Sequence, residues 1–125
     1  MNPKVQMIIN FMNANLHRKL SSDKLANSIE ISRSHLCHLF KTETGMPAGQ
    51  YLQMLRMQKA ARLLAATLMS VKQIMVEVGY GDKAHFTHHF KKVYGLTPSA
   101  YRAGHMALNL SKEDVARQDR HTGMS

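Results

Sequence analysis

Cysteine, tryptophan and long apolar runs are scarce or missing in this sequence of 125 residues. The single cysteine, Cys37, excludes an internal disulfide and gives no sign of an oxidising compartment. No apolar run approaches the ~18 residues needed to span a bilayer, and the N-terminus has no signal-peptide pattern. We therefore expect a soluble, cytoplasmic protein with no membrane partner. The hydrophobic content of 44% is enough for one compact domain or two small ones.

Acidic residues are also few. Asp and Glu number 8 against 17 Lys and Arg, which gives a formal net charge of +9. No acid lies between Glu43 and Glu77, and Asp82 alone lies between Glu77 and Glu113. The imbalance favours a polyanionic partner such as DNA, because phosphate repels carboxylates, although basic charge also aids solubility and attracts acidic membranes. The basic residues in these stretches are Arg56, Lys59, Arg62, Lys72, Lys83, Lys91, Lys92 and Arg102.

No segment shows the strict alternation of a half-buried strand. Apolar residues recur three and four positions apart, which is the helical period. In one predicted helix, for example, Phe86, Phe90 and Val93 are expected to face the core. We predict an all-α fold of seven helices with no sheet, covering about residues 3–16, 22–29, 33–44, 47–67, 70–78, 83–94 and 98–108.

The chain contains one structural unit twice. The segment His35-Leu-Cys-His-Leu-Phe-Lys41 aligns with His85-Phe-Thr-His-His-Phe-Lys91 at an offset of 50, with four of seven positions identical. The residues before the turn align at an offset of 49, so the second turn is one residue longer. Each copy has a short helix, a tight turn and a longer helix, which is the helix-turn-helix pattern. Two copies in a basic chain predict a protein that binds double-stranded DNA.

The segment between the two units is predicted to be one long helix. We expect residues 1–46 to form a first helix-turn-helix subdomain, 47–67 a linker helix, 68–110 a second subdomain and 111–125 a flexible tail. A helix over 47–67 is about 30 Å long at ~1.5 Å per residue. Successive major-groove faces on one side of DNA lie ~34 Å apart. The linker is therefore long enough to hold the two reading helices one turn of DNA apart.

The outward face of each reading helix is predicted to contact DNA. Residues near the N-terminus of such a helix usually reach base edges, whereas Lys near its C-terminus usually meets phosphate. For a single polar side chain, a solvated helix face is the alternative interpretation. The predicted base-reading residues are Arg33, Ser34, Cys37 and His38 in the first unit, and Lys83, Ala84, Thr87 and His88 in the second. The predicted backbone contacts are Lys41, Lys91 and Lys92.

These residues resemble the DNA-binding domain of the AraC/XylS family of bacterial transcription regulators. The most specific stretch runs from Val78 to Arg102 and ends in Gly-Leu-Thr-Pro-Ser-Ala-Tyr-Arg. The resemblance covers roughly residues 4–106 and implies seven helices in two helix-turn-helix subdomains joined by a linker helix. It implies sequence-specific regulation of transcription, with double-stranded DNA as partner and RNA polymerase as a further candidate. Family members usually carry an effector-binding or dimerisation domain as well, so no effector ligand is expected within this segment.

The sequence departs from the family pattern at three places. His38 and His88 stand where Arg is common in the family, which puts the usual guanine contact in doubt. Met75 stands where a small residue is usual, so local packing is expected to differ. Pro47-Ala48 replaces the usual Ser-Pro and is expected to alter only how the linker helix begins.

A metal-binding protein, an enzyme and a nonspecific DNA binder each explain fewer of these sequence features than a sequence-specific DNA-binding protein does. His85, His88 and His89 have a spacing that suits metal ligands on a helix, but His88 and His89 are expected to point in different directions. Cys37 beside His38 suggests a nucleophile and a base, yet adjacent helical residues diverge by about 100°. A nonspecific nucleoid-type DNA binder is the main alternative. We predict no catalytic residue, no metal site and no cofactor.

Overall fold

The computed structural model describes residues 1–106, and these residues are helical with no strand. The predicted tail over 111–125 and the end of the last predicted helix lie outside the described residues. A seventh helical segment covers residues 98–106, so the predicted all-α fold with seven helices is confirmed. The other helices are α1 (Pro3–Ala14), α2 (Ser22–Ser28), α3 (Arg33–Thr44), α4 (Ala48–Ala66), α5 (Val71–Glu77) and α6 (Lys83–Tyr94).

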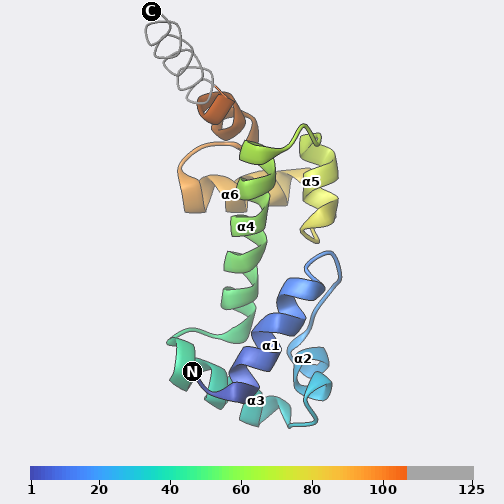
Figure 1. The fold of residues 1–125 in the computed structure, drawn as a ribbon, viewed down its shortest axis with the longest axis vertical. Helices are drawn as coiled ribbons and strands as arrows, with labels where there is room; N and C mark the ends of the chain where they lie inside the picture. The colour runs from blue at the N-terminus through green and yellow to red at the C-terminus, as the bar shows by residue number, and fades with distance from the viewer. Residues whose placement is uncertain (107–125) are drawn as a thin grey trace, which may run out of the picture.

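Helix α4 is the long axis of the molecule. In Figure 1, α1, α2 and α3 lie at the N-terminal half of α4, while α5, α6 and the last segment lie at its C-terminal half. Pro47 is its N-cap and Thr67 its C-cap, so the helix agrees with the predicted linker to within one residue at each end. At 19 residues and ~1.5 Å per residue it is about 28 Å long.

Short-range capping bonds set the helix ends. The Ser32 hydroxyl accepts a hydrogen bond from the backbone N–H of His35, and Asp82 accepts one from Ala84. Ser70 and Gln73 form a reciprocal capping box at the start of α5. Such bonds satisfy backbone donors that have no partner within the helix. At the other end of α3 and α6, glycines in the left-handed conformation stop the helix (Gly45 and Gly95).

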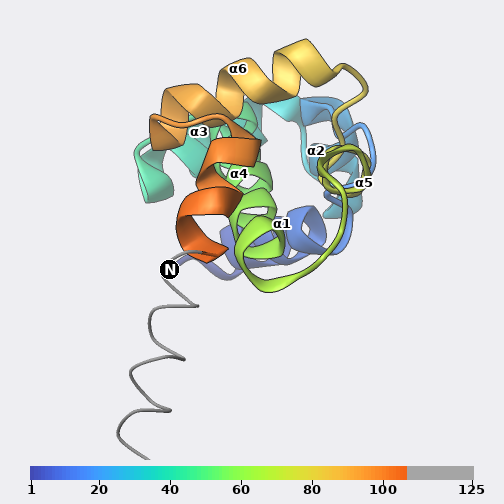
Figure 2. The ribbon, with the colours of Figure 1, turned by 90° about the horizontal axis from the view of Figure 1, so that it is seen from above.

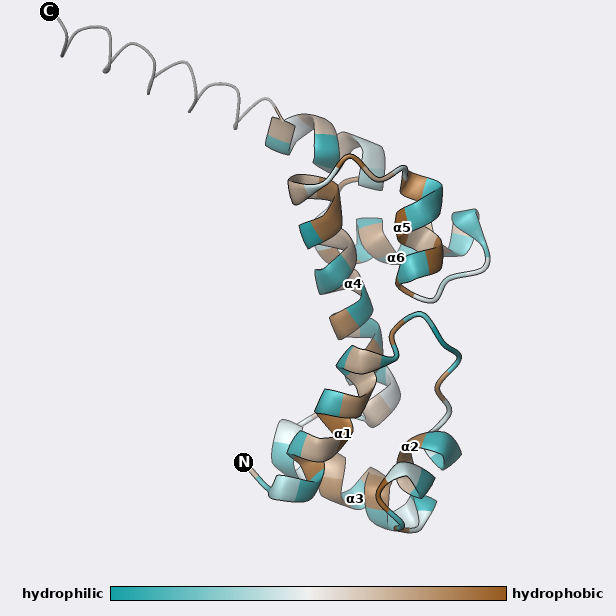
Figure 3. Cartoon of the chain, turned by 45° about the vertical axis from the view of Figure 1, so that its right-hand side comes forward, coloured by the Kyte–Doolittle hydropathy of each residue, from teal (hydrophilic) through white to brown (hydrophobic). Residues whose placement is uncertain are grey.

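The hydrophobic core is divided into two clusters, one at each end of α4. The first gathers apolar residues of α1, α2 and α3 and ends on α4 at Leu52. The second begins on α4 at Met57 and includes Phe86 and Phe90 of α6. In Figure 3, hydrophobic stretches of the ribbon (brown) occur in the helices of both halves of the molecule. Each half of the molecule thus buries its own apolar side chains, and α4 contributes to both.

One predicted core residue is on the surface. Phe86 and Phe90 are fully buried, as predicted, but Val93 is 55% exposed. The prediction for Val93 is therefore wrong. In the last turn of α6, Tyr94 packs against the second core in place of Val93, and its ring centroid lies 4.7 Å from that of Phe90.

Candidate nucleic-acid interface

The two predicted reading helices, α3 and α6, lie on the same side of the molecule. Figure 2 looks along the long axis and places both at the same edge, with α1 toward the opposite edge. In Figure 1 they lie at opposite ends of α4. The fold therefore presents two helices in succession along one face.

Helix α3 buries one face and exposes the other. Leu36 and Phe40 are fully buried in the first core cluster. The exposed residues of α3 include all five that were predicted to contact DNA there, namely Arg33, Ser34, Cys37, His38 and Lys41. Their side chains are available to a partner that approaches this face.

Helix α6 repeats the arrangement. Phe86 and Phe90 point into the second core cluster. The residues predicted to contact DNA in α6 are exposed except for Thr87, which is half-buried; the exposed ones are Lys83, Ala84, His88, Lys91 and Lys92. Lys91 and Lys92 lie in the last turn of α6, as Lys41 lies in the last turn of α3. A cation there also interacts favourably with the negative end of the helix dipole.

A polar cluster between α4 and α6 was not predicted from the sequence. The Tyr80 hydroxyl lies 2.9 Å from Nδ1 of His89, and the Gln53 amide of α4 contacts the same nitrogen. Burial lowers the pKa of His89, and the nearby charges of His85, His88 and Lys92 lower it further. A neutral imidazole can accept a hydrogen bond at Nδ1. The cluster thus ties α6 to the linker helix.

The internal repeat contains a signal for this cluster. His89 aligns with Leu39 at an offset of 50, and both residues are half-buried in the structure. The second unit therefore has a polar ring where the first has an apolar side chain. Burial also raises the pKa of Tyr80, while its hydrogen bond with Gln53 and the charge of Arg56 lower it. The half-buried polar side chain at position 89 therefore predicts a hydrogen-bond partner on a neighbouring helix.

No three His, Cys, Asp or Glu side chains among residues 1–106 are grouped as the ligands of a metal ion would be. None of the described helices is both long and apolar enough to cross a membrane.

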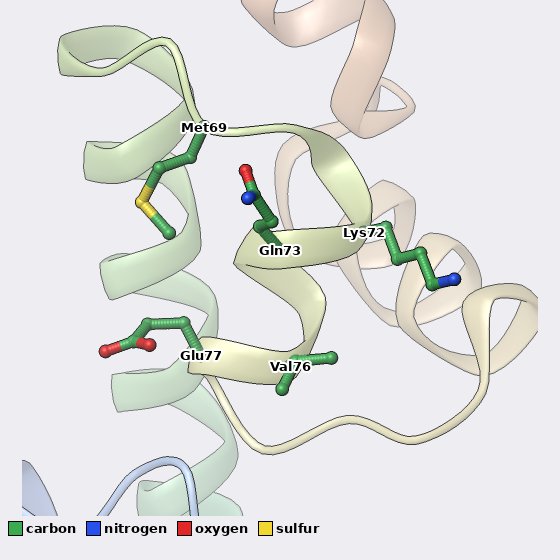
Figure 4. Close-up of a pocket in the computed structure, with 5 residues that line it drawn as sticks. All are labelled: Met69, Lys72, Gln73, Val76 and Glu77. Atoms are coloured by element: carbon green, nitrogen blue, oxygen red, sulfur yellow. The ribbon is translucent and has the colours of Figure 1, made fainter.

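A shallow groove lies along α5, away from the predicted DNA contacts. Figure 4 shows its lining residues, Met69, Lys72, Gln73, Val76 and Glu77. Glu77 also pairs with Lys59 of α4, with Nζ and Oε1 3.5 Å apart. None of the predicted base-reading or backbone residues lines this groove.

Comparisons with known proteins agree with this geometry. The family model described as a helix-turn-helix domain matches residues 25–104. A solved transcriptional regulator from Chromobacterium violaceum, described as AraC-type, is 32% identical, with a TM-score of 0.77 over 82% of this chain and 92% of that chain. The chain belongs to the AraC/XylS family.

Other members show how this AraC/XylS chain compares in length. It is 34% identical over 108 residues to the lactose operon transcription activator of Staphylococcus xylosus, covering 86% of this chain and 38% of the activator. The chain therefore spans less than half the length of that relative. The DNA-binding domain of AdpA, solved in complex with a target DNA, is 26% identical, with a TM-score of 0.79 over 85% of this chain and 96% of that one.

Proposed function

We propose that this AraC/XylS chain binds double-stranded DNA sequence-specifically and regulates transcription. In this proposal α3 and α6 enter two successive segments of the major groove on one side of the duplex. The observation that carries it is the placement of both helices on one side of α4. The helix is about 28 Å long, close to the ~34 Å between successive groove faces. The likeness to a DNA-bound domain supports the same arrangement.

The exposed residues of the two helices divide by their position. Arg33, Ser34, Cys37 and His38 in α3 are proposed to read bases, as are Lys83, Ala84, Thr87 and His88 in α6. Lys41, Lys91 and Lys92 are proposed to contact phosphates, since cations in the last turn lie farther from the groove floor. In this proposal the first subdomain covers 1–46 and the second 68–110, joined by the linker helix. The division of the core into two clusters supports these bounds.

Selection of binding sites from random duplexes tests the proposal. We expect two short sequence motifs whose centres lie about ten base pairs apart. At ~150 mM salt the selected duplex should bind ~10³-fold or more tightly than random duplex. Equal affinity for both duplexes would instead favour a nonspecific nucleoid-type binder.

A double substitution tests the assignment of the reading residues. Thr87→Ala with His88→Ala removes two proposed base contacts from α6 and should relax selectivity in one half of the site only. The matched control is Cys37→Ala with His38→Ala in α3, which should relax the other half. At each base pair that is no longer discriminated, the difference in binding free energy between the preferred base pair and a mismatch is expected to shrink by about 1–3 kcal/mol. Unchanged selectivity in either half would remove that pair from the base-reading set.

RNA polymerase is a candidate second partner, because one curated relative is named as an activator of an operon. We also propose that the chain works in the bacterial cytoplasm, where a regulator of transcription meets the chromosome. Transcription from a template carrying the selected site, with and without the protein, tests this partner. A change in transcript yield that occurs only on templates with the selected site supports RNA polymerase as a partner. No change on any such template argues against it.

A further inference from the structure

The two helix-turn-helix units meet at a junction halfway along α4. The first core cluster reaches Leu52, the second begins at Met57, and Arg56 lies between them. In Figures 1 and 3 the loop between α1 and α2 approaches the turn after α5 at this level. The junction therefore involves three segments, which are the α1–α2 loop, α4 and the α5–α6 turn.

Arg56 is packed between both units. Its Nη2 donates a hydrogen bond of 2.7 Å to the carbonyl oxygen of Arg18, in the α1–α2 loop. Its Nε is buried and has no hydrogen-bond partner among residues 1–106. Burial lowers the pKa of Arg56, and the charge of Tyr80 raises it. Arginine stays protonated in proteins, so a charged donor from the linker helix holds the loop of the first unit.

Gly79 lies on the other side of the same junction. A Cβ built on Gly79 would lie well inside 3.0 Å of the Leu16 carbonyl oxygen, and 3.3 Å from both Cζ and Nε of Arg56. Leu16 is buried in the first core cluster, and Val78 and Tyr80 beside Gly79 are buried in the second. The backbones of the two units are therefore in direct contact at a point where a side chain has no room.

The first unit shows that the turn itself does not require glycine. Glu30 aligns with Gly79 at an offset of 49 and has the same left-handed conformation, with φ of 57° against 87°. The turn hydrogen bonds also match, since Ile31 donates to Ala26 as Tyr80 donates to Met75. A residue with a large side chain thus occupies the equivalent turn. The close approach of Leu16, rather than the turn, explains glycine at position 79.

We propose that Arg56 and Gly79 act as positioning residues that hold the two units at one separation and one angle. The junction would then determine which spacing between DNA half-sites the protein accepts. The part of this inference that concerns DNA spacing rests on the proposed function, whereas the fixed placement of the two units does not. A shift of one base pair displaces a half-site by ~3.4 Å and rotates it by about 34°, because one turn contains ~10–10.5 base pairs. A rigid junction cannot follow such a change without breaking contacts.

The first experiment measures the junction without DNA. Nitroxide labels on the exposed native Cys37 and on an Ala84→Cys substitution report the distance between α3 and α6 by pulsed electron resonance. We expect one narrow distance distribution in this labelled parent and a clearly broader one after Arg56→Met. Lys59→Met is the matched control, because it also removes one cation from α4, but Lys59 pairs with Glu77 of α5 and not with the first unit. It should leave the distribution narrow, and equal widths in all three proteins would overturn the proposal.

Gly79→Ala tests the junction from its other side and carries the test if Arg56→Met lowers the helix content. Its control is Gly95→Ala, because Gly95 also has a positive φ, of 76°, but has nothing within 4 Å of its Cβ position. Both substitutions strain a left-handed backbone to a similar degree. We expect only Gly79→Ala to broaden or shift the distance. Equal effects of the two substitutions would assign the glycine to the turn and contradict the proposal.

The second experiment measures binding to the selected duplex and to duplexes with one base pair added or removed between the half-sites. We expect the wild-type affinity to fall about tenfold per inserted base pair, and the Arg56→Met affinity to fall less than about threefold. Affinity for a single half-site should be equal in both proteins. A uniform loss at every spacing would overturn the proposal. Absence of any preferred duplex for the wild type would refute the proposed function, while the distance measurement would still decide on the junction.

Discussion

Arg102 is predicted to stabilise the C-terminal end of the linker helix, and its removal tests the tertiary contacts of the last helical segment. Its Nε donates to the carbonyl oxygen of Leu64 at 3.1 Å, and its Nη2 donates to that of Thr67 at 3.3 Å. Carbonyls in the last turn of a helix have no partner within the helix. Helix α4 has no basic residue of its own in that turn. Arg102 therefore supplies both the donors and the positive charge.

The expected cost of Arg102→Ala follows from these contacts. A hydrogen bond to a charged group contributes about 1.5–3 kcal/mol, and a cation at a helix C-terminus about 0.3–1 kcal/mol. Because Arg102 is partly exposed and its second bond is long, we count about one full bond and expect a loss of roughly 2 kcal/mol. For a domain of this size the melting temperature should fall by about 8–16 °C, at roughly 4–8 °C per kcal/mol.

Urea denaturation followed by circular dichroism measures the free energy of unfolding. The matched control is Arg62→Ala, which removes an exposed arginine from α4 itself and should change stability by less than about 0.5 kcal/mol. Arg102→Lys should lie between the two, because it keeps the charge but not the planar fork of donors. If Arg102→Ala and Arg62→Ala lower stability equally, then the carbonyl contacts contribute nothing and the reasoning is wrong.

Three further tests concern α6, the helix proposed to face DNA, and its core. Lys91→Ala should weaken binding to every duplex and lower the slope of log affinity against log salt by about one; a change in sequence preference alone would refute its phosphate contact. In a urea titration, Phe90→Ala should lower the free energy of unfolding by about 3–5 kcal/mol and Val93→Ala by less than about 0.5 kcal/mol, since of the two only Phe90 is buried. Equal losses would indicate that Val93 also packs in the core. The lowered pKa of His89 favours its neutral form in the fold, so its contribution should be complete above the unfolded pKa of about 6.5 and decline as the pH falls below it. Unfolding between pH 5 and 7.5 should therefore depend less on pH in His89→Gln, and an unchanged pH dependence would contradict this assignment.

The helices and their buried faces could be predicted because both depend on neighbours in sequence. Ser32, Ser70 and Asp82 cap helices through backbone groups two or three residues away. Phe86 and Phe90 are buried because the helical period places them on one face. The repeat could have corrected the error at Val93, since the aligned residue of the first unit is Glu43, which is exposed.

Contacts between distant segments could not be predicted in the same way. The hydrogen bond from Arg56 to Arg18 joins residues 38 positions apart, and His89 meets Gln53 across 36 positions. A helical period states which face of a helix is apolar, but not which loop another unit brings against its polar side. The hydrogen-bond partners of Arg56 and His89 depend instead on how segments far apart in the chain pack against one another.

The amino-acid sequence by itself determined the number of helices, their caps, the repeated unit and the face of each reading helix, because these rest on short-range bonds and on the burial of periodic apolar side chains. Only the tertiary structure decided that α3 and α6 share one side of α4 and that Gly79 meets Leu16. The reason is physical: local interactions act within one or two helical turns, whereas the orientation of the two units is set by packing and hydrogen bonds between segments far apart in the chain.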